Sequence, residues 1–235
     1  IGDICIIIEP ALVYDERNRY LFKEIVEMIA LKLLVILPEG GSYKLNMVHP
    51  YDLATGTICA MERGDFGEAY IICDDHVLEL REIAEMVAAE TSVRPITQSI
   101  SKERLKKFVT QLENIQAMLP ALKGMEPLAS ILENLGIDLS SGFELPMDPD
   151  YMITHHHFTN AKLKEVTKRN KGKWRVNPDS VEYFKDGWYP VMDPRVEIPK
   201  VIRYWTSTKP PIIPKNADLQ DVLEFLFKYI KRIMG

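Results

Sequence analysis

Two hydrophobic patterns alternate along the first hundred residues of the chain. Residues 4–8 read ICIII, and a run that is apolar at every position is typical of a strand buried on both faces in a parallel sheet. Apolar residues at intervals of three and four predict amphipathic helices over residues 20–32 and 78–89. Strands of the first kind, separated by helices of the second kind, predict an α/β fold.

Shorter strands and further helices are expected between and beyond these elements. Strand patterns occur at 34–37, 67–72 and 95–100. Ser101 is a good N-cap, because its hydroxyl can accept a hydrogen bond from an unpaired backbone N–H. Further helices are expected over 102–136, after an N-cap at Asn160, over 196–205 despite Pro199, and over 218–233 beyond a proline-rich linker at 209–215.

The stretch from 40 to 60 joins a turn, a strand and a helix. Gly40 and Gly41 predict the turn, because glycine enters positive φ without a steric cost. Residues 44–48 alternate as in a short strand, and Pro50 suits the first turn of the helix that follows. This helix is expected to turn three side chains inward, those of Leu53, Ile58 and Met61.

Three polar residues lie close to the start of that helix: Lys44, Asn46 and His49. Polar groups at a strand end beside a helix N-terminus are a common way to build a ligand site. The alternative, which is commoner for such a pattern, is an ordinary strand–helix corner with His49 hydrogen-bonded inside it.

Composition and charge narrow the class of protein. The chain has 235 residues, of which 46% are hydrophobic and 27% charged, as in ordinary globular domains. A net charge of −5 argues against a general nucleic-acid binder, so the basic run at 168–173 is interpreted as a solvated loop. No apolar run approaches the roughly 20 residues of a membrane-spanning helix, and no signal-peptide pattern opens the sequence.

The cysteines and the histidine run at 155–157 indicate neither a disulfide nor a metal site. Cys5, Cys59 and Cys73 are widely spaced in apolar runs, which predicts buried free thiols and therefore a cytoplasmic location. Residues 155–157 are three adjacent histidines, but neighbours on a strand point to opposite faces, so no metal is expected. No G-x-S-x-G elbow is present, which leaves a serine hydrolase unsupported.

Several segments resemble the second half of the extended short-chain dehydrogenases/reductases, which include NAD-dependent epimerases, dehydratases and hydroxysteroid dehydrogenases. The 40–60 stretch resembles the family's late G-x-G-S-x-x-x-N/D-x-V-H-V-D-D-L-A segment, with Pro50 and Tyr51 where valine and aspartate are more usual. The 67–72, 78–89 and 158–165 segments resemble its G-E-x-Y, T-L-R-E-I-A-E and F-D-N-S-K-L-K-E segments in the same order. The resemblance covers roughly residues 3–205 and is carried by the following residues: Pro10, Val13, Tyr14, Gly41, Ser42, Asn46, Val48, His49, Asp52, Leu53, Ala54, Gly67, Glu68, Tyr70, Phe158, Asn160, Lys162, Leu163, Gly187, Trp188 and Pro190.

This resemblance implies roles for two groups of residues. The segment of Pro10, Ala11, Val13 and Tyr14 would close the nicotinamide end of an NAD or NADP cofactor. Glu9 and Asp15 stand where the family has arginine and glycine, so the loop departs from the usual pattern. The polar residues near the helix start, Lys44, Asn46 and His49, would contact a small-molecule substrate.

The resemblance also implies a division of the chain. The expected fold is α/β: the C-terminal part of a Rossmann-like fold with a mostly helical substrate-binding region. Residues 1–100 would hold strands and helices of the sheet, 101–205 the helical substrate-binding or lid region, and 206–235 a proline-rich linker with a terminal helix. Residues 166–186 are expected to be an insertion, and the apolar character of 102–150 favours a lipophilic substrate.

Two motifs of the family are missing from this sequence. It contains no G-x-x-G-x-x-G loop for the cofactor pyrophosphate, and no tyrosine is followed by lysine four positions on. No catalytic residue is therefore assigned to this chain. The start at Ile1 is expected to fall just after the family's catalytic helix, so that a nucleotide-binding half, or a second copy of the chain, would cover the strand at Ile4–Ile8.

Two functions remain open on the sequence alone. The resemblance implies that the chain is the substrate-side portion of an NAD(P)-dependent oxidoreductase, epimerase or dehydratase acting on a carbon that bears a hydroxyl or carbonyl. Alternatively, it is a non-catalytic binding or scaffold subunit that keeps only the substrate-side half of the fold.

Overall fold

The computed structural model describes residues 5–18, 21–31, 36–93, 98–104, 107, 155–156, 158–172, 175 and 184–213. Ile4, most of the predicted 102–136 helical region, and the predicted 218–233 helix lie outside these residues.

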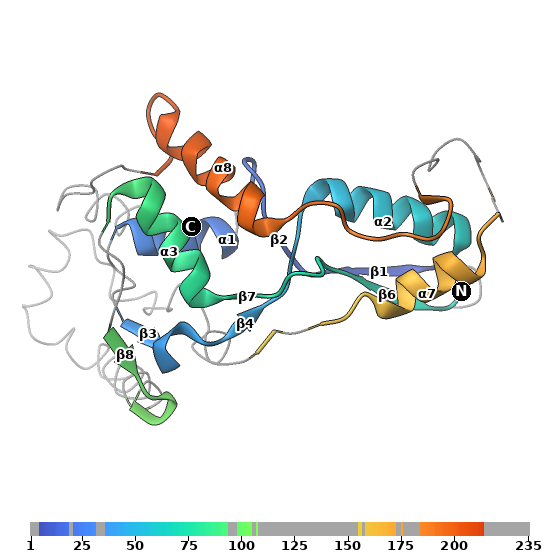
Figure 1. Ribbon diagram of the computed structural model, residues 1–235, viewed down its shortest axis with the longest axis horizontal. Coiled ribbons are helices and arrows are strands. Elements are labelled where there is room, and N and C mark those ends of the chain that lie inside the picture. The colour runs from blue at the N-terminus through green and yellow to red at the C-terminus, as the bar shows by residue number, and fades with distance from the viewer. Residues whose placement is uncertain are drawn as a thin grey trace, which may run out of the picture.

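The described residues form the predicted mixture of strands and helices (Figure 1). The strands are β1 (Ile7–Pro10), β2 (Leu12–Val13), β3 (Ile36–Pro38), β4 (Lys44–Leu45), β5 (Met47–Val48), β6 (Ala69–Ile72), β7 (Leu78–Glu79) and β8 (Gln98–Ile100). The helices are α1 (Leu21–Ala30), α2 (Pro50–Arg63), α3 (Leu80–Thr91), α7 (Ala161–Arg169) and α8 (Pro194–Ser207), with a short 3₁₀ turn at Glu39–Gly41. The α/β fold class is thereby confirmed.

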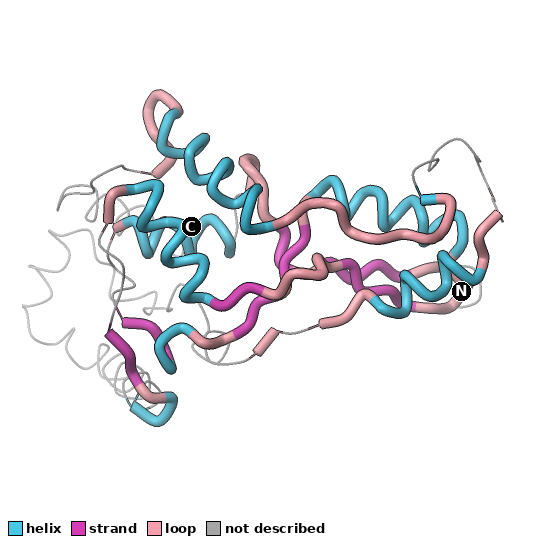
Figure 2. Tube along the Cα trace, in the orientation of Figure 1, coloured by secondary structure: helices cyan, strands magenta, loops and turns pink. Residues whose placement is uncertain are grey.

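The strands pair two by two. β1 with β6, β2 with β5, and β3 with β8 are parallel, whereas β4 with β7 is antiparallel. Parallel pairing needs a crossover connection, and α2 lies between the partners of one such pair, β1 and β6. Figure 1 and Figure 2 show the β4–β7, β2–β5 and β1–β6 pairs following one another through the middle of the molecule, whereas β3 and β8 lie at the end that holds α1 and α3.

Two hydrophobic cores hold the elements together. One is built where α1, α3 and α8 pack on one another and includes the buried rings of Phe22 and Trp205. The other lies where α2 and α7 meet β6 and includes the buried ring of Trp188. Figure 1 shows the first group of helices at one end of the molecule and the second at the other.

The helix starts follow from local chemistry. α2 begins at Pro50, whose missing N–H costs nothing in a first turn, after His49 as N-cap. α8 begins in the same way at Pro194, with the Asp193 side chain accepting a hydrogen bond from the Arg195 N–H at 2.9 Å. Pro199 lies early in α8, and the helix continues through it as predicted.

The periodic helices were predicted well. α1 and α3 lie within two residues of their expected bounds, and the buried face of α3 contains each of the expected positions: Leu80, Ile83, Ala84 and Val87. Ser101 accepts a hydrogen bond from the Arg104 N–H at 3.3 Å, as expected of an N-cap. The prediction of buried free thiols is confirmed for Cys59 and Cys73, whereas Cys5 is only partly buried.

The prediction for residues 4–8 was wrong in bounds and in burial. The strand begins at Ile7 and runs on through Glu9 and Pro10, and 52% of Ile7 is exposed. Among the described strands β1 has one neighbour, β6, so its other edge is open. An apolar sequence shows what a strand can bury but not how many strands lie beside it.

The prediction of one strand over 44–48 was also wrong. The strand is divided at Asn46, because β4 pairs with β7 while β5 pairs with β2. The preceding turn is as predicted, with φ of 65° at Gly40 and 78° at Gly41.

The inward face of α2 differs from the expected one. Met61 is 46% exposed, and Leu53 and Ile58 are only partly buried. Leu53 and Ile58 do pack against the second core, together with small residues, and a Cβ at Gly56 would lie 3.0 Å from Ile72 and 3.1 Å from Trp188. The helix packs too closely for long side chains at that position.

None of the helices in the described part of the chain is long and apolar enough to cross a membrane.

The turn before β4 yields a matched pair of variants. Gly41 and Gly172 both have φ of 78°, but a Cβ at Gly41 would lie 2.8 Å from Leu37 Cδ1 and 2.9 Å from the Arg81 N, whereas one at Gly172 would meet nothing within 4 Å. We expect Gly172→Ala to cost about 1 kcal/mol of unfolding free energy from backbone strain alone, and Gly41→Ala about 3 kcal/mol. Urea unfolding measures both, and equal losses would contradict the predicted steric contribution.

Candidate functional site

The candidate site lies where the carboxyl ends of three strands meet. β2 ends just before Tyr14, β5 just before His49, and β6 is followed after Cys73 by Asp74. The Asp74 N–H donates to the Met47 carbonyl at 2.7 Å, which holds the end of β6 against β5. The carboxyl ends of parallel strands are a frequent place for ligands in α/β proteins.

Tyr14 anchors the segment that the sequence linked to the cofactor. Its side chain is fully buried, and its N–H donates to the Val48 carbonyl at 3.2 Å. The ring packs against Phe22, with centroids 5.9 Å apart, and against His49 at 5.6 Å in an edge-to-face arrangement. These contacts place Tyr14 beside one of the predicted substrate residues.

His49 forms the corner between β5 and α2. Its Nδ1 accepts a hydrogen bond from the Tyr51 N–H at 3.2 Å, and its carbonyl accepts one from the Leu53 N–H at 2.9 Å. The side chain is therefore the N-cap of α2, with its ring lying against Tyr14.

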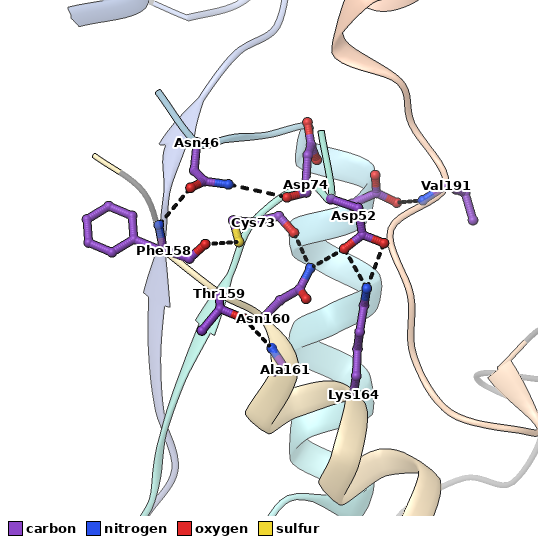
Figure 3. Close-up of polar contacts among 11 residues, drawn as sticks. Asn46, Asp52, Cys73, Asp74, Phe158, Thr159, Asn160, Ala161, Lys164 and Val191 are labelled. Atoms are coloured by element: carbon purple, nitrogen blue, oxygen red, sulfur yellow. Dashed lines mark hydrogen bonds and ion pairs between the residues drawn. The ribbon is translucent and has the colours of Figure 1, made fainter. Parts of the chain in front are cut away.

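Asn46 is buried and uses both ends of its amide (Figure 3). The Oδ1 accepts a hydrogen bond from the Phe158 N–H at 2.7 Å, and the Nδ2 donates to the Asp74 carbonyl at 3.4 Å. The Asn46 main chain also donates to the His156 carbonyl at 2.8 Å. Asn46 thus ties a distant segment of sequence to the strand ends.

Asn160 serves the same junction rather than the helix it precedes. It was predicted to cap α7, but its Nδ2 donates to the Cys73 carbonyl at 2.7 Å and to Asp75 Oδ1 at 2.9 Å. The Thr159 hydroxyl accepts a hydrogen bond from the Ala161 N–H at 3.2 Å. The Asn160 side chain is drawn away because the turn after β6 presents a buried carbonyl that needs a donor.

Asp52 is a fully buried carboxylate with well-defined partners. Its Oδ1 accepts from the Val191 N–H at 3.0 Å and its Oδ2 from the Met192 N–H at 2.9 Å. Burial raises the pKa of Asp52, while these two N–H donors act in the opposite direction. The residue fixes the segment after Trp188 onto the start of α2.

Asp74 is buried as deeply but has different surroundings. Only 1% of it is exposed, and neither of its carboxylate oxygens makes a hydrogen bond of normal geometry with the described residues. Burial, followed by the charge of Asp52, raises the pKa of Asp74 to about 8. The Tyr14 hydroxyl faces this carboxyl, and burial together with Asp74 raises the pKa of Tyr14 above its usual value.

Cys73 sits between these groups but is unreactive. Burial raises the pKa of its thiol to about 11, so it stays protonated at neutral pH. The Sγ lies 3.9 Å from the Phe158 carbonyl oxygen, as a weak donor.

Not all of the predicted site residues come together. Val13 pairs with Val48, next to Tyr14 and His49, whereas Lys44 lies on the separate β4–β7 pair with an exposed side chain. Pro10 is exposed at the end of β1, and the Ala11 N–H donates to the Ile72 carbonyl at 3.0 Å.

The histidine run contributes main-chain and ring contacts at β4. His155 Nδ1 accepts from the Lys44 N–H at 3.2 Å, and the His156 N–H donates to the Lys44 carbonyl at 2.9 Å. Within the part of the chain that is described, no three histidine, cysteine or acidic side chains are grouped as a metal site would need.

Sequence reasoning missed Asp74, which turns out to be central. The available signal was a pair of acidic residues, Asp74 and Asp75, directly after the apolar end of β6. Polar residues at the carboxyl end of a parallel strand are frequently used to bind ligands in α/β proteins. The sequence alone could not show that the two acids differ, because their neighbours are distant in sequence. Asp75 pairs with Lys164, whereas Asp74 turns towards Tyr14.

Comparisons with known proteins give structural likenesses only. No family model matches the sequence, and no curated protein is significantly similar to it. The crystal structure of gox2253 aligns with 85% of this chain and 48% of its own, at 18% identity and a TM-score of 0.49. RMD from Pseudomonas aeruginosa, complexed with NADPH, aligns with 86% of this chain and 47% of its own, at 10% identity and a TM-score of 0.44.

A third similar structure is DesIV from Streptomyces venezuelae, a dTDP-glucose 4,6-dehydratase with NAD and TYD bound. It aligns with 87% of this chain and 44% of its own, at 11% identity and a TM-score of 0.47. The chain thus spans about half the length of these structures. At such identities and TM-scores the likenesses do not identify the activity of the chain.

The role of Asn46 can be measured as stability. Asn46→Ala removes the acceptor for the Phe158 N–H and the donor to the Asp74 carbonyl, so we expect a loss of about 2 kcal/mol in unfolding free energy. Lys44→Ala, two residues away on an exposed side chain, should cost less than about 0.5 kcal/mol. Chemical denaturation compares the two, and equal losses would show that the Asn46 amide does not hold the junction.

Proposed function

We propose that this chain is the substrate-side portion of an NAD(P)-dependent oxidoreductase, epimerase or dehydratase that acts on a carbon bearing a hydroxyl or carbonyl. The observation that carries the proposal is the contact between Tyr14 and His49. It joins the segment that resembles the family's nicotinamide-closing loop to the segment that resembles its substrate side. These two stretches are more than 30 positions apart in sequence, yet they meet at the carboxyl ends of parallel strands.

The cofactor-facing segment would run from Pro10 to Tyr14. Pro10 is exposed and Val13 is half-buried, so both offer apolar surface to a flat ring, and Ala11 lies between them. Tyr14 is the buried anchor of this segment rather than a surface residue. A bound nicotinamide would supply or accept the hydride, whereas the residues of this chain would orient it and exclude water.

The substrate side would be built from Lys44, Asn46 and His49. Asn46 fixes the main chain through its two hydrogen bonds, and His49 fixes the start of α2. Lys44 is the exposed member and offers a positive point charge to a polar substrate group. We extend the proposal to a lipophilic substrate because of the apolar 102–150 region, which lies almost entirely outside the described residues.

The proposal includes a partner for β1. The sequence lacks the glycine-rich loop and the Tyr-x-x-x-Lys pair, so a nucleotide-binding half would have to supply both. Such a half, or a second copy of the chain, would pair with the open edge of β1 and cover Ile7. We also propose a cytoplasmic location, where the buried thiols of Cys59 and Cys73 stay reduced.

A second candidate function is supported by the burial of Asn46. Only 2% of this residue is exposed, and both ends of its amide are bound to main-chain groups, as in a purely structural residue. A binding or scaffold subunit that keeps this half of the fold without catalysis would show the same geometry. The coding sequence upstream of Ile1 discriminates between the two functions, since only the enzyme needs an in-frame glycine-rich loop and Tyr-x-x-x-Lys.

Cofactor affinity tests whether this chain depends on a separate nucleotide-binding half to hold the dinucleotide. The 235-residue chain alone should bind NAD or NADP only weakly, because no loop in it can surround the pyrophosphate. Isothermal titration calorimetry of the purified chain with each dinucleotide measures this. Sub-micromolar affinity would show that the cofactor site is complete in this chain.

A substitution at His49 separates function from folding. Asparagine is a strong N-cap, so His49→Asn should keep the start of α2 and cost only about 1 kcal/mol of stability, from the lost ring contact with Tyr14. It removes the imidazole, so in the complete enzyme kcat/KM should fall at least about tenfold while the Kd for the cofactor stays nearly constant. Steady-state kinetics and calorimetry give the two values, and unchanged kcat/KM would make His49 a structural cap only.

A further inference from the structure

Two buried carboxyl groups near the strand ends, those of Asp52 and Asp74, differ in their hydrogen bonding. Asp52 receives a main-chain N–H on each oxygen, from Val191 and Met192, which favours its ionised form. Asp74 receives no hydrogen bond of normal geometry from the described residues. When two neighbouring acids have such different environments, one stays ionised and the other keeps its proton.

The groups that face Asp74 reinforce this difference. They are the Tyr14 hydroxyl after β2, the His49 main-chain N–H at the start of α2, the Asp52 carboxylate on α2 and the Asp75 carboxylate in its own turn. Burial and the charge of Asp52 are the largest effects, and they outweigh the donors. Keeping Asp74 protonated costs less free energy than burying a second negative charge, without a partner, beside Asp52.

The main chain of Asp74 is hydrogen-bonded to the Asn46–His49 segment. Its N–H donates to the Met47 carbonyl at 2.7 Å, and its carbonyl accepts from Asn46 Nδ2 at 3.4 Å. Its side chain, by contrast, lies near the Tyr14 hydroxyl at the end of β2, although neither group makes a hydrogen bond of normal geometry with the described residues. Asp74 therefore lies between two segments: its main chain contacts the 46–49 segment, and its side chain lies towards the 10–14 segment.

We propose that the buried carboxyl group of Asp74, unpartnered among the described residues, keeps its proton at the join between the Tyr14 segment and the Asn46–His49 segment, and that loss of this proton weakens this join. The meaning of these segments for a reaction rests on the proposed function, but the join itself does not. Deprotonation transfers the carboxyl proton to solvent and leaves a buried anion beside Asp52. The chain thus contains a switch that weakens the candidate site as the pH rises.

The direction of the pH dependence follows from linkage. An aspartate in the unfolded chain ionises near its ordinary pKa of about 3.9, whereas Asp74 in the folded chain ionises near 8. Between these values the folded state holds one more proton than the unfolded state. Stability is therefore greatest below the unfolded pKa, falls as the pH rises towards 8, and is constant with respect to this group above it.

The first experiment follows unfolding of the full chain with pH. Urea midpoints between pH 5 and pH 9 should fall for the wild type and level off near pH 8, while Asp74→Asn should lack this fall, because its amide cannot ionise. Asp75→Asn removes a carboxylate from the same turn and should keep the fall. Tyr14→Phe should move the upper limit to higher pH, since the Tyr14 hydroxyl lowers the pKa of Asp74. An Asp74→Asn profile parallel to that of the wild type, or an upper limit unmoved in Tyr14→Phe, would overturn the proposal.

A second experiment observes the proton and the join directly. Infrared difference spectra of the wild type at pH 7 and pH 9 should lose the carbonyl stretch of an un-ionised carboxylic acid, and Asp74→Asn should show no such change. Amide exchange at Tyr14 should be about tenfold faster in Asp74→Ala and close to the wild-type rate in Asp74→Asn, which keeps a donor. Absence of the carboxylic acid band, or equal exchange in both variants, would contradict the proposal. Neither measurement uses cofactor or substrate, so failure of the proposed function would leave both results unchanged.

Discussion

The satisfaction of buried polar groups at the carboxyl ends of β2, β5 and β6 is the constraint on which this structure depends. Three strands end together between two hydrophobic cores, and their last carbonyl and N–H groups are shielded from water. Asn46 and Asn160 supply the missing donors and acceptors, and each reaches main-chain groups of a different segment. Without them the meeting of the two cores would leave unpaired polar groups, each of which costs about 1–3 kcal/mol.

Asp52 and Asp74 show how one fold can give the same residue type two different electrostatic environments. Asp52 and Asp74 are equally hidden, yet the first is held by N–H donors and the second faces a hydroxyl and a neighbouring acid. Burial alone therefore does not set the charge of an acid; the supply of donors decides it. The proposed nicotinamide and substrate segments meet at Asp74, the acid with fewer hydrogen-bond donors around it.

The parts of the fold that could be predicted from sequence are those that depend on neighbours along the chain. The face of α3, the proline at the start of α2 and the turn at Gly41 are local, and the structure confirms them. The division of the strand at Asn46, the exposure of Ile7 and the partners of Asn160 depend on residues far away in sequence. Of the site, the resemblance assigned Tyr14 to the cofactor segment and His49 to the substrate side, whereas the surroundings of Asp74 were not readable because they are assembled from three strands.

The contacts that complete the junction also join very distant parts of the sequence. Phe158 meets Asn46 across 112 positions, and Asn160 meets Cys73 across 87. Closing such a loop costs entropy that grows only with the logarithm of its length, by about 0.6 kcal/mol for each doubling. The junction can therefore be closed across such long sequence separations at little thermodynamic cost, provided that the two asparagines remain. This arrangement comes at the expense of slower folding, because contacts so far apart in sequence form late.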